Sequence, residues 1–252
     1  MPKISPQAIV EPGATLADDV VVGPFAFVGS QVTLGPGCII ENNATLTGRT
    51  VLGSKCLVFP MACVGEATDG GQGHCFIGDG TNLREHVTVY GGPENAPTRL
   101  GKDNLVMIGS QVGSAAQVGS HGIFANFTQI DAGAVVEDFV RTSGFSHVGE
   151  NARVGAYTFI SGYTLIEHHA PPFAMVQGSP GRVRGVNSQN LKRCGFGDQD
   201  LRLLKRAFRR LFNGEGLKTN QQALQGILDD GDANPHVRSL ADALVEAGGQ
   251  HG

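Results

Sequence analysis

The sequence predicts a mainly β protein: a parallel β-helix of hexapeptide repeats, followed by a C-terminal α-helical domain. Three observations predict this fold. An aliphatic residue recurs at every sixth position over most of the chain, the two interruptions of that period are rich in Gly, Pro and Asn, and beyond about residue 198 the apolar period becomes helical. Neither the two-residue period of an ordinary strand nor the 3.6-residue period of a helix would hold phase over such a distance.

The six-residue period runs from Ile4 to Ile166 and comprises 26 positions, of which 24 are Ile, Leu or Val. The exceptions are Phe124 and Thr142. Each such side chain is expected to point inward, and Gly, Asp or Asn often follows where the chain must turn. Three hexapeptides make one triangular coil, so residues 18 positions apart should stack above one another along the solenoid axis.

The period is interrupted twice. The step from Val64 to Ile77 is 13 residues, and the step from Val89 to Leu100 is 11 residues. Their composition predicts loops, near residues 65–76 and 90–99, that leave a corner of the coil. Loops that project from a rigid scaffold commonly carry function.

The period ends after Ile166, and a segment marked by Pro and Gly leads out of the solenoid. Leu201, Leu204 and Phe208 then recur at helical spacing, and two further amphipathic segments follow at 217–230 and 234–247. We therefore divide the chain into a β-helix at residues 1–186 and a C-terminal helical domain at 187–252, which can cap the open end of the solenoid.

Composition excludes several classes of protein. A net charge of −4 argues against general nucleic-acid binding. Five cysteines without a CxxC spacing argue against a disulfide framework or a zinc site and favour a reducing compartment. The N-terminal residues do not resemble a signal peptide, and no stretch approaches the length of a membrane span. We expect a cytoplasmic protein without a metal, a cofactor or an integral membrane segment.

Several segments resemble one family in register: VQGSPGRVRGVNSQNLKRCGF, LREHVTV and FANFTQIDAGAVVEDF. The resemblance covers nearly the whole chain, and the family is that of the acyl-[acyl-carrier-protein]–UDP-N-acetylglucosamine O-acyltransferases of lipid A biosynthesis. It implies a left-handed β-helix, a homotrimer with active sites between subunits, and acyl carrier protein and a UDP-amino sugar as partners. The family reaction moves a 3-hydroxyacyl group from the carrier to the sugar 3-hydroxyl.

The sequence departs from the family at the catalytic motif H-x-x-H-D, in which the second His is the general base and the Asp orients it. The matching positions are Gln111, Ser114 and Ala115. Serine does not accept a proton at neutral pH unless another base adjoins it. Asp69, in the shortened first loop, is the nearest candidate for the Asp that holds the sugar. Other family histidines are replaced as well, by Tyr90, Gly133 and Gly149.

Some binding positions of the family are retained. Gly162 matches a glycine that leaves room for a long acyl chain, and Asn187 matches an Asn that contacts the nucleotide. Arg193 matches an Arg near the phosphates. Gln189 stands where the family has Glu, and Cys194 where it has a second Arg.

The 18-residue step suggests where a substitute base could lie. Gln111 and His147 belong to one column, and Ser114 and Glu150 belong to its neighbour. His147 and Glu150 thus repeat the His-x-x-polar spacing two coils, or roughly 10 Å, further along the axis. A His beside a carboxylate is a suitable general base. The simpler interpretation is that both are solvated corner residues.

Basic residues are concentrated late in the chain, where a docking surface for an acidic carrier protein or a nucleotide diphosphate is one interpretation. A solvated helix face is the other. Between Arg182 and Arg210 there are nine Lys or Arg against Asp198 and Asp200.

Three hypotheses compete. The first is an acyltransferase with a substitute base. The second is a catalytically silent paralogue that binds a UDP-sugar, an acyl ligand or acyl carrier protein, or that joins mixed trimers. The third is a trimeric scaffold without an acyl ligand. The retained Gly162, Asn187 and Arg193 favour the first two over the third.

Overall fold

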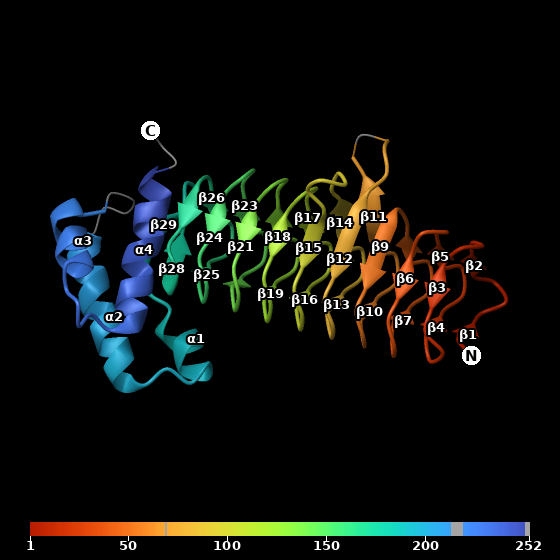
Figure 1. Cartoon of the computed structure of the whole chain (residues 1–252), viewed down its shortest axis with the longest axis horizontal. Helices are drawn as coiled ribbons and strands as arrows, with labels where there is room; N and C mark the ends of the chain where they lie inside the picture. Colours follow the sequence, from red (N-terminus) through yellow and green to blue (C-terminus); the bar gives the residue numbers. More distant parts are fainter. Residues whose placement is uncertain (69, 213–218, 250–252) are drawn as a thin grey trace.

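The computed structural model describes residues 1–68, 70–212 and 219–249. Short strands wind into a long solenoid whose first coil holds the N-terminus, and the helices gather at its other end (Figure 1). The strands stack in three sheets, one for each side of the coil.

The first sheet has 11 strands and the other two have nine each. The first contains, in spatial order, β1 (Lys3–Ile4), β4 (Val21–Val22), β7 (Ile39–Ile40), β10 (Leu57–Val58), β13 (Asn82–Leu83), β16 (Leu105–Val106), β19 (Ile123–Phe124), β22 (Arg141–Thr142), β25 (Phe159–Ile160), β28 (Ala174–Gln177) and β29 (Arg182–Val186). The second contains β2 (Ile9–Val10), β5 (Phe27–Val28), β8 (Thr45–Leu46), β11 (Cys63–Ala67), β14 (Thr88–Gly91), β17 (Gln111–Val112), β20 (Gln129–Ile130), β23 (His147–Val148) and β26 (Leu165–Ile166). The third contains β27 (His169–Ala170), β24 (Arg153–Val154), β21 (Val135–Val136), β18 (Gln117–Val118), β15 (Thr98–Leu100), β12 (His74–Ile77), β9 (Arg49–Leu52), β6 (Thr33–Leu34) and β3 (Thr15–Leu16).

Pairing within each sheet is parallel except between β28 and β29. Its register follows the 18-residue step in the regular coils, lengthens where a loop intervenes, and shortens to 16 residues where β24 pairs with β27 and β25 with β28. The periodic residues face the interior and are buried from Val22 onward. Both exceptional positions also face inward. Phe124 is 1% exposed, and the buried hydroxyl of Thr142 lies 2.6 Å from the Thr128 hydroxyl and accepts a hydrogen bond from the Ala125 amide. The predicted β-helix of hexapeptide repeats with C-terminal helices is thus confirmed.

Three rows of corners separate the sheets. We name them by what they carry: the cavity corner joins the second sheet to the third (residues 113–116, 131–134 and 149–152). The helix corner joins the third to the first (119–122, 137–140 and 155–158), and the glycine corner joins the first to the second (125–128, 143–146 and 161–164). Their outward-pointing side chains do not take part in the strand pairing, so these vary in size from one corner to the next.

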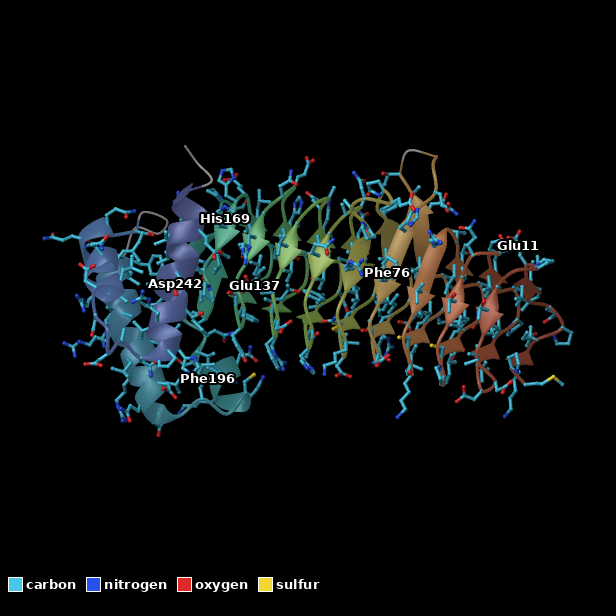
Figure 2. All side chains as sticks on the ribbon, viewed as in Figure 1. Glu11, Phe76, Glu137, His169, Phe196 and Asp242 are labelled. Atoms are coloured by element: carbon cyan, nitrogen blue, oxygen red, sulfur yellow. The ribbon has the colours of Figure 1, made fainter. Side chains whose placement is uncertain are left out.

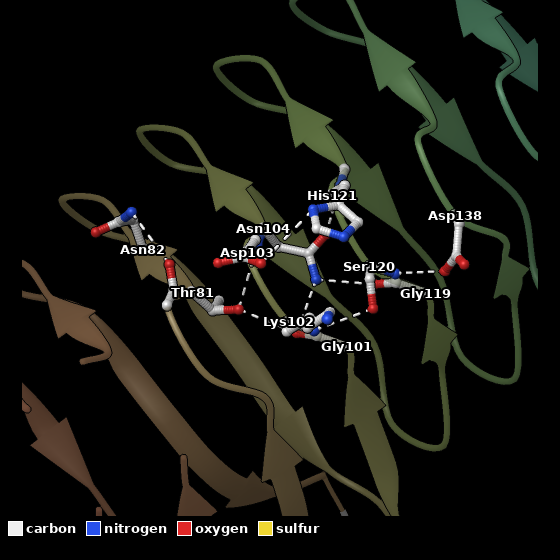
Figure 3. Close-up of polar contacts among 12 residues, drawn as sticks. Thr81, Asn82, Gly101, Lys102, Asp103, Asn104, Gly119, Ser120, His121 and Asp138 are labelled. Carbon is white, nitrogen blue, oxygen red and sulfur yellow. Dashed lines mark hydrogen bonds and ion pairs between the residues drawn. The ribbon is translucent and has the colours of Figure 1, made fainter. Parts of the chain in front are cut away.

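The helix corner begins with buried polar side chains that link successive coils (Figure 3). The Asn104 amide nitrogen donates to the carbonyl oxygens of Gly101 (2.9 Å) and Gly119 (2.8 Å), and its oxygen accepts from the Gly122 N–H (2.7 Å). The Thr81 hydroxyl also donates to Gly101. Burying these groups costs little because each polar atom has a partner.

Four helices follow the solenoid: α1 (Ser188–Arg193), α2 (Asp198–Leu211), α3 (Gln221–Leu228) and α4 (Pro235–Gly249). The sequence predicted the last three, and α1 is an addition. Phe196, labelled in Figure 2, packs edge-on against Tyr157, with ring centroids 5.1 Å apart. None of the helices in the described ranges has both the length and the apolar character that crossing a bilayer requires.

Candidate functional site

The second sheet presents a column of polar side chains next to the cavity corner. Gln111 on β17, Gln129 on β20 and His147 on β23 are paired in register. The inward neighbour of each is an aliphatic core residue, so these three side chains must face outward. The structure therefore forms the column that the 18-residue step predicted.

His147 is held by a carboxylate. Its Nε2 lies 2.6 Å from Oδ2 of Asp131, and the Gln129 amide nitrogen donates to the other oxygen of the same carboxylate at 2.7 Å. The two side chains are 37% and 26% exposed, so the pair is partly shielded from water but open on one side. The arrangement fixes the ring and leaves Nδ1 as the nitrogen available to a ligand.

The partner of His147 is therefore Asp131, whereas sequence analysis paired His147 with Glu150. Asp131 directly follows β20, 16 residues before His147. A contact between a corner residue of one coil and a strand residue of the next does not follow the 18-residue step. The spacing of the sequence therefore does not predict it. Glu150 is exposed and belongs to the same surface.

A cavity of about 420 Å³ lies at the cavity corner, and Asp131 lines it, whereas His147 is not among its lining residues. It brings together three residues that sequence analysis selected, Gln111, Ser114 and Glu150, with the newly found Asp131. Its complete lining is Thr68, Tyr90, Gln111, Gly113, Ser114, Asp131, Ala132 and Glu150. Asp69 lies outside the described residues.

Two lining residues explain how the cavity is shaped. A β-carbon at Gly113 would lie 2.5 Å from the backbone nitrogen of Ala132, so only glycine allows the next coil to approach this closely. The Ser114 hydroxyl donates to the carbonyl oxygen of Gly91 at 3.2 Å. Its proton is therefore engaged by the backbone where β14 ends, and the bonds that the structure gives it do not include one to a side-chain base.

The other residues that the sequence resemblance selected lie elsewhere. The Asn187 amide donates to the Tyr157 carbonyl at 2.8 Å and accepts from the Asn190 N–H at 3.4 Å, so it caps α1 and ties it to the helix corner. Gln189 and Arg193 are exposed on α1, and Gly162 lies at the glycine corner. Within one chain these residues and the cavity occupy three different corners.

Two family models match the chain: "Udp N-acetylglucosamine O-acyltransferase; Domain 2" over residues 170–250, and the bacterial transferase hexapeptide over residues 13–48. A Pseudomonas putida acyl-[acyl-carrier-protein]–UDP-N-acetylglucosamine O-acyltransferase is 32% identical over 254 residues, 98% of each chain. The Rhizobium johnstonii enzyme of that name is also 32% identical, over 93% of this chain and 89% of its own. The chain belongs to the UDP-N-acetylglucosamine O-acyltransferase family.

Solved structures agree with this assignment. LpxA from Acinetobacter baumannii superposes with a TM-score of 0.89 at 30% identity, covering 96% of both chains. The Arabidopsis UDP-N-acetylglucosamine acyltransferase gives a TM-score of 0.84 at 27% identity, over 97% of this chain and 96% of its own. The solenoid is thus the left-handed β-helix of this family, and the resemblance found in the sequence is confirmed.

Proposed function

We propose that the protein transfers a 3-hydroxyacyl group from acyl carrier protein to a hydroxyl of a UDP-amino sugar, with His147 as general base and Asp131 as its orienting carboxylate. The observation that carries this proposal is the 2.6 Å contact between His147 and Asp131, because Asp131 lines the cavity and links His147 to it. It supplies, from β23 and from the corner that follows β20, a His–carboxylate pair in place of the pair that the family motif has at the positions of Ser114 and Ala115.

The chemistry follows from the tautomer that this contact favours. With the Nε2 proton donated to Asp131, Nδ1 carries the lone pair that accepts the proton of the acceptor hydroxyl. The hydroxyl oxygen then forms a bond to the thioester carbon, the carbon–sulfur bond breaks, and the imidazolium returns the proton to the departing thiolate. Asp131 stabilises the imidazolium between these steps, and Gln129 keeps the carboxylate in place.

The partners proposed are acyl carrier protein and a second and third copy of the chain. The exposed arginines of α2 and its lysine, Lys205, suit an acidic carrier, since opposite charge accelerates encounter. A trimer is supported by the family assignment and by the separation of the cavity from Asn187, Gln189 and Arg193, which a neighbouring subunit can bring together. The five cysteines are free, as the reducing cytoplasm would keep them.

A second candidate function is binding without turnover. It is favoured by Ser114, whose hydroxyl donates to the backbone, and by Gln111 and Ala115, which cannot accept a proton. Such a protein would keep the cavity and the nucleotide positions while lacking a base in contact with the acceptor.

Mass spectrometry of acyl transfer from 3-hydroxyacyl carrier protein to UDP-N-acetylglucosamine tests the proposal. We expect His147→Ala and Asp131→Asn to lower kcat by roughly 10²–10⁴-fold, the contribution typical of a general base. Glu150→Gln is the matched control. It also removes a carboxylate from the cavity lining, but not the carboxylate that contacts His147, which belongs to Asp131. Full activity in His147→Ala would refute the assignment of the base. A wild type that binds the UDP-sugar without turnover would favour the silent paralogue.

A further inference from the structure

Arg141 is an isolated cation on the outward face of the first sheet. It lies on β22 between Ile123 of β19 and Phe159 of β25, with which it is paired in register. It is half-buried, and over residues 1–68, 70–212 and 219–249 no carboxylate forms an ion pair with it. A half-buried guanidinium without an ion-pair partner keeps its donors free to bind an anion.

Helix α1 ends beside this guanidinium. Asn190, 3% exposed, donates from its amide to the carbonyl oxygen of Phe139 at 3.1 Å, only two residues before Arg141. One turn later, the N–H of Cys194 donates to the carbonyl oxygen of Asn190 at 2.9 Å and closes the helix. The hydrogen bonds of Asn190 thus hold the last turn of α1, with Arg193 and Cys194, against the corner that leads into β22.

The Cys194 thiol and the Tyr157 hydroxyl do not compensate the positive charge of Arg141. Burial raises the pKa of the Cys194 thiol, while the Arg141 guanidinium acts in the opposite direction, which places the two within electrostatic reach. Burial also raises the pKa of the Tyr157 hydroxyl, with smaller contributions from Cys194 and Asp138. Both groups are therefore neutral at pH 7, and neither provides an anion for Arg141.

The nearby cations differ in their partners. Lys192 lies 3.7 Å from the Asp198 carboxylate and is compensated. Arg193 is exposed, and its charge, like that of Arg141, is not balanced by an ion pair with any described residue. Two guanidinium groups with free donors fit the oxygens of two linked phosphates, because each can form paired hydrogen bonds to one phosphate.

We propose that Arg141 and Arg193 bind the diphosphate of the nucleotide sugar, with Arg141 supplying from β22 the charge that Cys194 does not supply from the end of α1. The inference rests on the proposed function, since it assumes a UDP-sugar as acceptor. It adds a binding residue from the solenoid at a place where the helix has lost one. The family pattern has Arg at the position of Cys194, so the charge has moved between two elements that lie side by side.

Calorimetric titration of UDP against four proteins tests this placement: wild type, Arg141→Ala, the double variant Arg141→Ala with Cys194→Arg, and Arg99→Ala. We expect Arg141→Ala to weaken UDP binding about tenfold or more, the effect typical of losing hydrogen bonds to a charged group. The double variant should recover most of the affinity. Arg99 is the control because it is also an outward-facing solenoid arginine, but on the third sheet, stacked over Phe76 at 4.5 Å.

Uridine and 4′-phosphopantetheine, measured by ligand-detected NMR, separate the possible causes. Uridine binding should be unchanged in Arg141→Ala, because uridine carries no phosphate. Equal affinity of wild type and Arg141→Ala for UDP would overturn the inference and leave the proposed function standing. The inference would also be overturned if Arg141→Ala lost affinity for uridine and UDP equally, or if it lost affinity for 4′-phosphopantetheine alone. If the wild type binds neither UDP nor UDP-N-acetylglucosamine, the proposed acceptor is wrong and the inference fails with it.

Discussion

The cavity corner and the helix corner use the same backbone for opposite purposes. At the helix corner, His121, Phe139, Tyr157 and Phe173 stack ring on ring, with centroids 4.7, 4.8 and 5.8 Å apart, and α1 docks against them. At the cavity corner the equivalent positions carry small or short side chains, and a cavity of about 420 Å³ remains.

The difference shows where a solenoid keeps its freedom. Strand pairing and the aliphatic interior define each coil, so the side chain at the third position of a corner can be large or small without changing the path of the chain. Ala115 and Phe139 both adopt positive φ, 62° and 58°, although the side chain of Ala115 is a methyl group and that of Phe139 carries an aromatic ring. Residues at this position can therefore be replaced with little cost to the fold.

Moving the base back to the cavity corner should produce the largest effect. In a His147→Ala background, Ser114→His with Ala115→Asp rebuilds the second His and the Asp of the family motif. We expect the triple variant to regain at least about tenfold of the kcat lost by His147→Ala, because a general base contributes roughly 10²–10⁴-fold. Single-turnover acyl transfer gives the measurement. Adding Ser114→His alone is the control, and equal rates for all three variants would show that the cavity corner no longer positions the acceptor.

Removing an aromatic ring should destabilise the protein more at the helix corner than at the glycine corner. Phe139 is sandwiched between His121 and Tyr157, whereas Phe145 stacks between Phe127 and Tyr163 and remains 51% exposed. We expect Phe139→Ala to lower the free energy of unfolding by about 2–4 kcal/mol, but Phe145→Ala by about 1 kcal/mol or less. Denaturant titration of both variants measures these free energies. Equal losses of unfolding free energy would mean that docking of α1 does not stabilise the helix corner.

The fold was readable from the sequence because each hexapeptide must place one aliphatic side chain inside. The same arithmetic predicted that Gln111 and His147 share a column. It could not predict Asp131, whose contact with His147 crosses from a corner to the strand of the next coil. It also missed α1, because six residues are too few to display a helical period. Neither the capping role of Asn187 nor the position of Arg141 beside Cys194 follows from spacing, since both depend on where α1 packs.

A β-carbon at Gly113 should disturb the cavity corner alone. It would lie 2.5 Å from the Ala132 nitrogen, and the adjoining coil would have to shift together with Asp131. We expect Gly113→Ala to cost about 1–3 kcal/mol of stability, as overpacking does, and to lower kcat as well. Gly231→Ala, where a β-carbon meets open space, is the matched control. Thermal unfolding and the acyl-transfer assay would contradict this prediction if Gly113→Ala matched the control in both.

The smallest effect expected concerns the thiol at the helix corner. Because the pKa of Cys194 is raised by burial and lowered by Arg141, removing the guanidinium should raise it further and reduce the thiolate fraction at any given pH. Only the thiolate reacts with iodoacetamide, so Arg141→Ala should slow alkylation of Cys194 at pH 8, by a few-fold at most. Peptide-resolved mass spectrometry follows this residue, with Cys63 on the second sheet as the internal reference. Faster alkylation of Cys194 in Arg141→Ala would mean that Arg141 acts there by shielding the thiol from reagent. In that case its charge would not be directed at the end of α1, which docks on the helix corner.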